Sequence, residues 1–447
     1  MFSLSNSAFL IIFLLSSLLF YKNFRKIIRN IKLGGDAGVF ENKRERWRNV
    51  LFIAFGQKKM FKKPLVAILH LVVYLGFVII NIEIIEIILD GILGTHRILF
   101  SPKWSSLYSF CINSFEILAL LVFVACIIFL IRRNIIKISR FWSPEMKGWP
   151  KSDANLILIF EILLMSAFLI MNAADLSLQK LAHTESYLQL KYPNTGNFLI
   201  SGMISSLMQG ISISNLILIE RFCWWFHIIG IFGFLNYLVI SKHLHIILAF
   251  PNTYFGSIKP KGQFNNMSSV TNEVKMMLDP NIDPFTEPVS TSQPVRFGAK
   301  DVTDLNWLHL LNAYSCTECG RCTAECPANV TGKKLSPRKI MMDVRDRVEE
   351  VGRGIDLKGK DFKDEKSLLH DFIKPEELWA CTSCNACVEA CPLSIDPLSI
   401  ILELRRYSVM EESSAPTELN AVFSNIENNG APWQFSASDR LNWKDDE

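Results

Sequence analysis

Apolar residues are concentrated in five long stretches of the first 250 residues, whereas the remainder of the 447-residue chain is mostly polar. The apolar stretches lie at about 3–21, 65–89, 107–131, 154–174 and 216–249. A helix needs roughly 20 residues to cross the hydrocarbon of a bilayer, which is about 30 Å thick. The pattern therefore predicts a mainly α protein with a five-helix transmembrane bundle. Half of all residues are hydrophobic, too many for a water-soluble globule of this length.

Positive charges between the apolar stretches predict the orientation of the bundle. The segments 22–63 and 132–151 are rich in Lys and Arg, whereas 90–106 and 175–215 hold few. No basic residue precedes the first apolar stretch, so it is a membrane anchor rather than a signal peptide. The positive-inside rule then places the N-terminus outside the cytoplasmic (inner) membrane. Because five spans is an odd number, everything after residue 250 is expected in the cytoplasm.

Two cysteine runs with the same spacing lie in the polar half. Each reads C-x2-C-x2-C-x3-C-P, with Cys316, Cys319, Cys322 and Cys326 in the first run and Cys381, Cys384, Cys387 and Cys391 in the second. This spacing holds [4Fe–4S] clusters in bacterial two-cluster ferredoxins, where the fourth cysteine ligates the other cluster. We therefore predict two [4Fe–4S] clusters with the ligand sets Cys316, Cys319, Cys322, Cys391 and Cys381, Cys384, Cys387, Cys326.

Zinc and disulfides are the alternatives for these cysteines. Zinc sites favour paired C-x2-C motifs with four ligands, and the C-x3-C-P ending is not typical of them. Disulfides need an oxidising compartment, which the predicted topology does not provide. The other three of the 11 cysteines (Cys111, Cys126 and Cys223) lie in apolar stretches and are expected to be small core residues.

Histidines in the apolar stretches are candidate haem ligands, because a polar group inside a membrane is costly without a function. His70 lies near the cytoplasmic end of the second stretch. In one continuous helix, His227 and His245 would be five turns apart on the same face, and His243 would face the other way. His245 then matches His70 in depth, so this pair is predicted to ligate a b-type haem. His227 would lie nearer the outer side, opposite Asn81.

Other interpretations of these polar residues stay open. His243 is the alternative ligand to His245, and both could instead snorkel to the interface beside Lys242. His227 could bind a quinone, ligate a second haem or form a hydrogen bond within the bundle. Four carboxyl groups within or bordering the apolar stretches could serve proton uptake or release: Glu83, Glu86, Glu116 and Glu161. Glu83 and Glu86 are better explained as marking the outer end of their helix.

The polar half divides further. Residues 251–300 are rich in Pro, Ser, Thr and Asn and are expected to be a linker. Residues 301–410 are expected to form the two-cluster domain, with a helix from Asp304 as N-cap to Tyr314 and another that has Pro337 at N1. The 54 residues between the runs favour a helical rather than a compact β-rich domain. Residues 411–447 form a polar tail that could dock a partner.

Three resemblances extend these expectations. The membrane half resembles the gamma subunit of respiratory nitrate reductase, with His70, His227 and His245 matching three of four haem ligands and Ile80 in place of the fourth. The resemblance thus implies one intact haem site and leaves the second without its fourth ligand. The region of the cysteine runs resembles the helical ferredoxin module of succinate dehydrogenase iron–sulfur subunits.

Nearly the whole chain, including Phe297–Asp304 and the paired runs, resembles membrane-bound heterodisulfide-reductase-like iron–sulfur oxidoreductases. Fused relatives continue into a module with C-C-G motifs, but no cysteine follows Cys391 here. The resemblance therefore implies a separately encoded C-C-G iron–sulfur subunit, or electron-transferring flavoprotein, as the redox partner.

The expected function is electron transfer from a soluble partner through two clusters and a b haem to a membrane quinone of the respiratory chain. Three alternatives remain: the reverse direction, with quinol oxidised and a soluble heterodisulfide-reductase-like partner reduced; a haem-free membrane anchor for an oxidoreductase; and a zinc-binding regulatory membrane protein. The net charge of +4 gives no indication of nucleic-acid binding.

Overall fold

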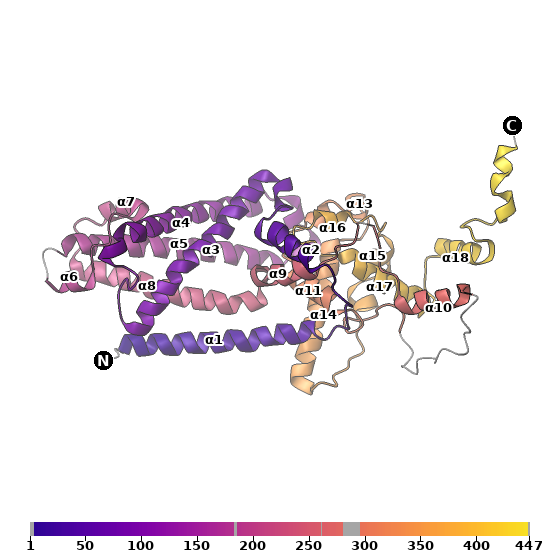
Figure 1. Cartoon of the computed structure of the whole chain (residues 1–447), viewed down its shortest axis with the longest axis horizontal. Coiled ribbons are helices and arrows are strands. Elements are labelled where there is room, and N and C mark those ends of the chain that lie inside the picture. The colour runs from indigo at the N-terminus through magenta and orange to yellow at the C-terminus, as the bar shows by residue number, and fades with distance from the viewer. Residues whose placement is uncertain (1–3, 183–185, 261, 280–295, 446–447) are drawn as a thin grey trace. The chain divides into compact units, whose positions relative to one another are not determined.

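A computed structural model describes residues 4–182, 186–260, 262–279 and 296–445 (Figure 1). Within these residues the protein is helical and contains no strand, only two isolated backbone bridges. Two compact units are present. The bundle unit comprises Met1–Arg29, Asn42–Phe255 and Tyr314–Gly320, and the C-terminal unit comprises Asn30–Glu41, Gly256–Ala313 and Arg321–Glu447. The predicted mainly α fold is confirmed.

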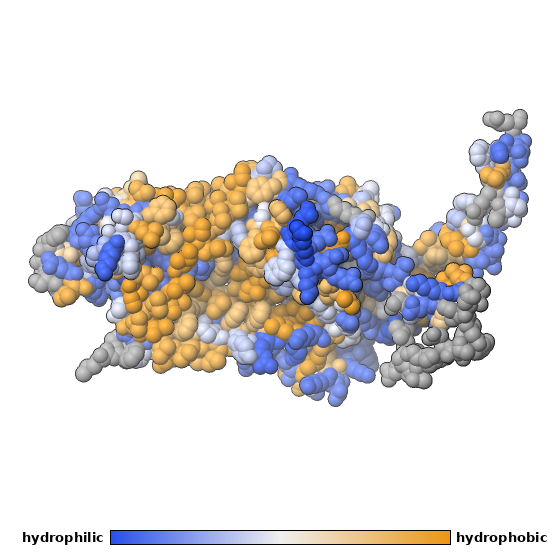
Figure 2. All heavy atoms as spheres, viewed as in Figure 1, coloured by the Kyte–Doolittle hydropathy of each residue, from blue (hydrophilic) through white to orange (hydrophobic). Residues whose placement is uncertain are grey.

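Five helices of the bundle unit are long and apolar enough to cross a membrane, which confirms the predicted number of spans. They are α1 (Leu4–Ile31), α3 (Pro64–Leu93), α4 (Ser105–Asn134), α5 (Trp149–Leu181) and α8 (Ile213–Tyr237). On the face shown in Figure 2, apolar side chains cover most of the surface of these helices. Helix α1 is the clearest example. Its Leu14, Leu15 and Leu18 side chains are about half exposed or more, as expected for residues that face lipid. Shorter helices complete the unit: α2 (Lys43–Asn49), α6 (Ser186–Lys191), α7 (Leu199–Leu207) and α9 (His245–Phe255).

Helix α5 lies at the centre of the bundle, where it packs against α4, α7 and α8, while α3 packs against α4. Phe168 of α5, Ile112 of α4 and Ile228 of α8 are buried in the shared core. Helix α1 joins through a close approach to α3: a Cβ atom at Gly91 would lie 2.6 Å from the Phe9 ring, so only glycine fits there.

The fifth span is interrupted, so the prediction of one continuous helix over 216–249 is wrong. Helix α8 ends at Tyr237, two 3₁₀ turns follow, and α9 begins at His245. Ser241 is extended between the two turns, with φ −111° and ψ 150°. A sharp break inside an apolar stretch leaves backbone polar groups without helical partners, and these must be satisfied within the protein.

Asp153 near the start of α5 satisfies the groups at this break. Its carboxylate accepts hydrogen bonds from Tyr237 OH (2.5 Å), Ser241 Oγ (2.7 Å) and the Lys242 backbone N–H (3.1 Å). The carboxylate is almost fully buried, with 1% of the residue exposed. A side chain 84 residues before Tyr237 in the sequence thus contacts residues on both sides of the break.

The C-terminal unit consists of short helices and one long one, α14 (Pro337–Lys358). The predicted start of α14 is confirmed, with Pro337 at N1 and Ser336 Oγ accepting a hydrogen bond from Lys339 N–H. The expected N-cap at Asp304 is wrong: α11 spans Trp307–Ser315, and Asn306 Oδ1 accepts from the His309 N–H (3.0 Å). The other helices are α10 (Ser268–Leu278), α12 (Arg321–Ala324), α13 (Pro327–Val330), α15 (Pro375–Trp379), α16 (Ala386–Ala390), α17 (Pro397–Met410) and α18 (Thr417–Asn429).

The expected linker is partly helical, because α10 lies within it. Residues 261 and 280–295 of the linker, including Pro280, Pro284, Pro288 and Pro294, lie outside the described residues, as do 446–447 of the expected tail.

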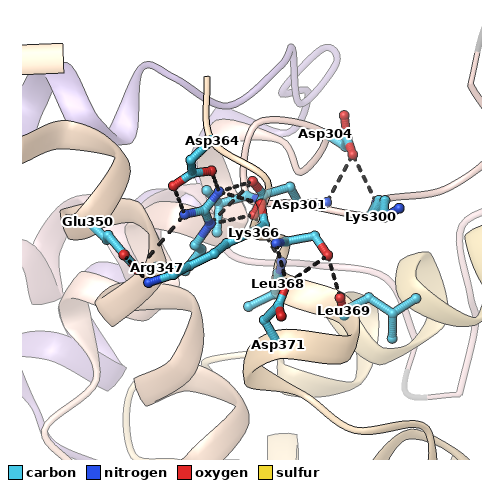
Figure 3. A network of polar contacts seen from close by, with 12 residues as sticks. Lys300, Asp301, Asp304, Arg347, Glu350, Asp364, Lys366, Leu368, Leu369 and Asp371 are labelled. Carbon is cyan, nitrogen blue, oxygen red and sulfur yellow. Dashed lines mark hydrogen bonds and ion pairs between the residues drawn. The ribbon is translucent and has the colours of Figure 1, made fainter. Parts of the chain in front are cut away.

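A buried arginine holds the C-terminal unit together (Figure 3). Arg347 of α14, only 2% exposed, binds Asp301 (2.7 Å) and Asp364 (2.6 Å) and also donates to the Lys366 backbone carbonyl (2.7 Å). Asp301 in turn accepts from the Leu368 N–H. The guanidinium thus joins two loops to one helix, as its planar fork of donors allows.

Residues 30–41 form part of this unit although they follow the first membrane-type helix in the sequence. The Gly35 N–H donates to Leu305 O (2.8 Å), and the Trp307 N–H donates to Gly35 O (3.0 Å). Phe40 packs on the Trp307 ring, with centroids 5.6 Å apart. The C-terminal unit is therefore assembled from segments on both sides of the bundle sequence.

Candidate functional site

The two cysteine runs follow the same backbone path. The third and fifth residues of each run have left-handed φ values: Glu318 (54°), Gly320 (70°), Ser383 (56°) and Asn385 (60°). The last cysteine of each run is extended, with φ and ψ of −79° and 118° at Cys326 and −74° and 124° at Cys391. Repeated sequence spacing thus becomes a repeated loop.

This loop fits a [4Fe–4S] cluster. Left-handed conformations are uncommon for residues other than glycine, and they persist where a site requires them. Glu318, Ser383 and Asn385 adopt this conformation between cysteines, which turns the chain tightly within one run. In the second run the Ser383 N–H also donates to Cys381 Sγ (3.4 Å). Hydrogen bonds to cluster sulfurs are one means by which proteins adjust the reduction potential.

Cysteines from both runs meet in the C-terminal unit. Helix α12, in the first run, packs against α16, in the second. Cys326 lies close enough to Cys381 and Cys387 to interact with them electrostatically. Burial raises the pKa of the Cys387 thiol to about 12, so cluster binding at this position must displace a proton. The exposed Cys384 completes the predicted set.

Arg405 of α17 is a residue at this site that sequence reasoning missed. Its guanidinium donates to Leu378 O (2.8 Å), Cys381 O (2.6 Å) and Ser383 Oγ (3.3 Å). It also lies over the Trp379 ring, 4.9 Å from the centroid. Arg405 therefore holds the start of the second run and places a positive charge beside it. No motif marks it, because its partners are backbone carbonyls about 25 residues earlier.

The second run also borders an open hollow. A cavity of about 360 Å³ is lined by Ser383, Cys384, Asn385, Ala386, Glu389 and Gly262. Cys384 is the exposed cysteine of the eight, whereas Cys316, Cys326 and Cys387 are buried. This side of the second run is thus open to solvent.

The start of the first run, residues 316–320, contacts the residues around the break in the fifth span. Glu318, between Cys316 and Cys319, forms an ion pair with the Lys242 ammonium, and its side chain is only 3% exposed. The same ammonium donates to Pro150 O, and Ser315 Oγ approaches Leu248 O at 3.5 Å. All of these residues belong to the bundle unit.

Three histidines gather at this end of the bundle. The His243 and His245 rings are 5.3 Å apart between centroids, and His243 also interacts electrostatically with His70. The expectation that His243 faces away from His245 is wrong, because the break at Ser241 removes the regular helical geometry on which it rested. The sequence gives little sign of this break, since no proline or glycine marks it.

Hydrogen bonding of the imidazoles suits iron ligation. Nδ1 of His70 lies 3.0 Å from Gln57 Oε1, and Nδ1 of His245 lies 3.1 Å from Lys242 O. A carbonyl oxygen can only accept, so Nδ1 carries the proton in each ring and Nε2 carries the lone pair. Metal-binding histidines commonly use one nitrogen in this way to fix the ring for the other.

His227 lies deeper in the bundle. It is 2% exposed, its Nδ1 is 3.1 Å from Leu164 O, and its ring faces Phe168. The hydrogen bond expected as one of its three possible roles is therefore present. Ile80 is buried in the core, and the Asn81 amide donates to Phe77 O of its own helix.

Comparison with known proteins agrees with the iron–sulfur interpretation. Residues 315–395 match the family described as "4Fe-4S dicluster domain". The chain is 28% identical over 445 residues to the "Probable iron-sulfur-binding oxidoreductase FadF" of Bacillus subtilis, covering 93% of this chain and 57% of that protein. It is 27% identical over 416 residues to the "EtfAB:quinone oxidoreductase" of Syntrophomonas wolfei, covering 88% and 53%.

A shorter similarity covers the cysteine runs. The chain is 36% identical over 107 residues to a ferredoxin/F(420)H(2)-dependent CoB-CoM heterodisulfide reductase subunit of Methanosarcina acetivorans, with 24% of this chain and 52% of that protein aligned. No solved structure matches. The chain spans just over half the length of the two longer relatives. It therefore joins five membrane-type helices to a 4Fe-4S dicluster domain, and the proteins it resembles are iron–sulfur oxidoreductases.

Proposed function

We propose that this chain is a membrane-anchored electron-transfer subunit that connects a soluble redox partner with a membrane quinone. Two [4Fe–4S] clusters and a b haem carry the electrons. The cluster ligands are Cys316, Cys319, Cys322 and Cys391 for one cluster and Cys381, Cys384, Cys387 and Cys326 for the other. His70 and His245 are the axial haem ligands, with His243 as the alternative to His245.

Lys242 is the observation that carries this proposal. Its backbone carbonyl lies 3.1 Å from Nδ1 of His245, and its ammonium pairs with Glu318 between two cysteines of the first run. One residue thus contacts both a candidate haem ligand and a candidate cluster loop. Such a connection supports a short path between the two redox centres.

When bound, the clusters and haem would supply the redox chemistry, and the protein fixes their positions and adjusts their potentials. Gln57 and the Lys242 carbonyl orient the His70 and His245 rings. Arg405 adds positive charge beside the second run, which favours the reduced form of a cluster held there. Exposed Cys384 makes the second run the contact point for the soluble partner.

The partners follow from the relatives and the charge pattern. The name of the Syntrophomonas wolfei relative supports an electron-transferring flavoprotein as donor and a quinone as acceptor. The heterodisulfide reductase relative supports an iron–sulfur partner, such as a C-C-G subunit. The basic segments 22–63 and 132–151 support a cytoplasmic location for the clusters and the inner membrane as the site of action.

Optical spectra of purified variants test the haem. His70→Ala and His245→Ala are expected to lose the dithionite-reduced b-type band, because each removes an axial nitrogen. His243→Ala is the matched control, since it removes a neighbouring ring, and it is expected to retain the band. Iron and sulfide analysis of the same samples should still give two clusters.

A wild-type protein without the band would exclude the haem and leave a haem-free anchor. Unchanged spectra in both His70→Ala and His245→Ala would also contradict the assignment. Loss of the band in His243→Ala but not in His245→Ala would mean that His243, rather than His245, is the axial ligand.

The reverse direction, with quinol oxidised and a disulfide-reducing partner reduced, is favoured only by the similarity to the heterodisulfide reductase of Methanosarcina acetivorans. The midpoint potentials of clusters and haem decide between the directions, because spontaneous electron flow runs toward the higher potential. A haem potential above those of the clusters supports quinone reduction, and the opposite order supports quinol oxidation.

A further inference from the structure

Carboxyl groups gather at the end of the bundle unit opposite the three clustered histidines. The end of α3, the loop after it, the start of α4, the end of α5 and the start of α8 meet there. Six acidic residues are at most 8% exposed: Glu83, Glu86, Asp90, Glu116, Asp175 and Glu220. Glu83 and Glu86 do lie near the helix end, as the sequence suggested, but they face the protein interior.

Most of these carboxyl groups are held by donors that match a carboxylate. Asp90 accepts from Thr95 Oγ1 and from the Arg97 and Ile98 backbone N–H groups. Asp175 pairs with Arg97 and His96, and Glu220 pairs with Arg221. Glu86 accepts from Tyr108 OH and the Leu99 N–H. Glu116 accepts from the Asn172 amide and from the Ile200 and Ser201 N–H groups.

Glu83 differs from the other five. Its Oε1 atom has a single long contact, 3.4 Å to Arg97 Nη1, and its buried Oε2 atom has no hydrogen-bond partner among the described residues. Arg97 directs its shorter contacts elsewhere, to Asn172 (2.6 Å) and Asp175 (2.9 Å). An unpartnered buried carboxyl oxygen in a native structure needs an explanation, such as a bound water.

A small cavity lies beside Glu83. Its volume is about 20 Å³, enough for one water molecule but not for an organic ligand. Asp90, His96, Arg97 and Asp175 also line it, and these polar groups provide the partners that a buried water needs. The His96 side chain is 13% exposed, so it links the cavity to the surface.

The charges around the cavity favour binding of a proton. Five of the six buried carboxyl groups line the cavity together with Arg97 and His96, and Arg221 contacts Glu220 and His96. Arg97 attracts a negative charge on Glu83, whereas Glu86 and Glu116 repel it, and burial away from water disfavours it further. An excess of buried negative charge is costly, and the carboxyl group with the weakest partners accepts the compensating proton.

We propose that Glu83 and one water in this cavity form a proton-exchange site that opens to the surface through His96. In the protonated form, Glu83 Oε2–H donates to the water. The proton passes to the water, and the water gives its own proton to Nδ1 of His96, whose other contact is a long one to Arg221 (3.5 Å). The imidazolium stays paired through Nε2 with Asp175 (3.1 Å) and becomes neutral again when solvent takes the proton from Nδ1. Glu83 is left as a carboxylate beside Arg97. No redox centre is needed for this exchange, so the site stands independently of the proposed haem and clusters.

Infrared spectroscopy in H₂O and D₂O tests the site at neutral pH. We expect a protonated-carboxyl C=O band that shifts in D₂O and is absent from Glu83→Gln. Exposed Glu273→Gln is the surface control and should keep the band. Glu161→Gln tests a membrane-embedded carboxyl group of α5 and should also leave this band in place. Loss of the band in Glu161→Gln but not in Glu83→Gln overturns the assignment.

The path through His96 is tested by the rate at which the band shifts after mixing with D₂O. His96→Phe should slow the shift on the order of a hundredfold, the lower end of what a positioned acid–base group contributes. An unchanged rate overturns the path and leaves Glu83 as an isolated protonated group. Unfolding midpoints of the variants in detergent verify that Glu83→Gln and His96→Phe are folded, and Glu83→Asp provides a second variant that retains a carboxyl group.

Discussion

The buried polar groups at the two ends of the bundle unit have different kinds of hydrogen-bond and ion-pair partners. At one end, His70, His243 and His245 surround a break in the fifth span, and their partners are mostly neutral carbonyl groups. At the other, six carboxyl groups surround Arg97 in a network of side chains. Neutral rings with one nitrogen fixed are suited to hold a cofactor. A charged network is suited to hold the loops and to store a proton.

This difference predicts that a change at the carboxylate end damages the fold most. Arg97→Met removes the guanidinium that binds the buried Asp175 carboxylate, which should cost about 3–5 kcal/mol of unfolding free energy. Chemical unfolding in detergent measures the loss. Exposed Lys103→Met, in the same loop region, is the control and should change the unfolding free energy little. A loss below about 1 kcal/mol in Arg97→Met would mean that water already solvates the network.

A change at the histidine end should affect cofactor binding before it affects the fold. Asp153→Ala leaves the donors of Tyr237, Ser241 and Lys242 without their acceptor, at a cost of about 2–3 kcal/mol. The break then loses its geometry, so the content of the proposed haem should fall well below that of the wild type. Asp153→Asn, which keeps an acceptor, should recover part of it. Full haem content in Asp153→Ala would show that the break is held by other contacts.

A smaller effect is expected at the link between the histidine end and the first cysteine run. Glu318→Gln keeps the side-chain shape but removes the charge paired with Lys242, which should cost about 1–2 kcal/mol. Haem reduction by the clusters should also become slower in stopped-flow traces. Exposed Glu325→Gln in the same run is the control. Equal rates in the two variants would contradict a path through Lys242.

The smallest effect is expected at Glu83 itself. Because its Oε2 atom has no protein partner among the described residues, Glu83→Gln should change the unfolding free energy by less than about 1 kcal/mol. Comparison with Arg97→Met then separates the proton site from the structural network around it. A loss as large as that of Arg97→Met would mean that Glu83 is part of the structural network.

Features that depend on local pattern were predictable from the sequence. Apolar length alone predicts the five spans. The equal spacing of Cys316 to Cys326 and of Cys381 to Cys391 predicts two equivalent loops, and the structure adds that both contain left-handed residues at the same two positions. Pro337 at N1 predicts the start of α14 for the same reason, since its effect acts within one turn.

Features that depend on distant partners were not predictable. At the break in the fifth span, Asp153 accepts three hydrogen bonds from Tyr237, Ser241 and Lys242, which lie 84 to 89 positions later. Arg97 is counted from the sequence as one of the few loop charges, yet it is buried against Asp175, 78 residues away. Arg405 likewise finds its carbonyl partners only in the folded chain. In each case the local sequence is compatible with an exposed side chain or a continuous helix, and contacts with distant residues determine the observed conformation.

The backbone bridge between Gly35 and the residues around Asn306 has a consequence for the modularity of the protein. A fragment that begins after the linker would carry every cluster cysteine but would lack the segment that pairs with Leu305 and Trp307. Such a fragment should express poorly on its own, and adding residues 30–41 as a peptide should improve its solubility. The two halves are thus expected to be inherited together rather than exchanged by recombination at the linker.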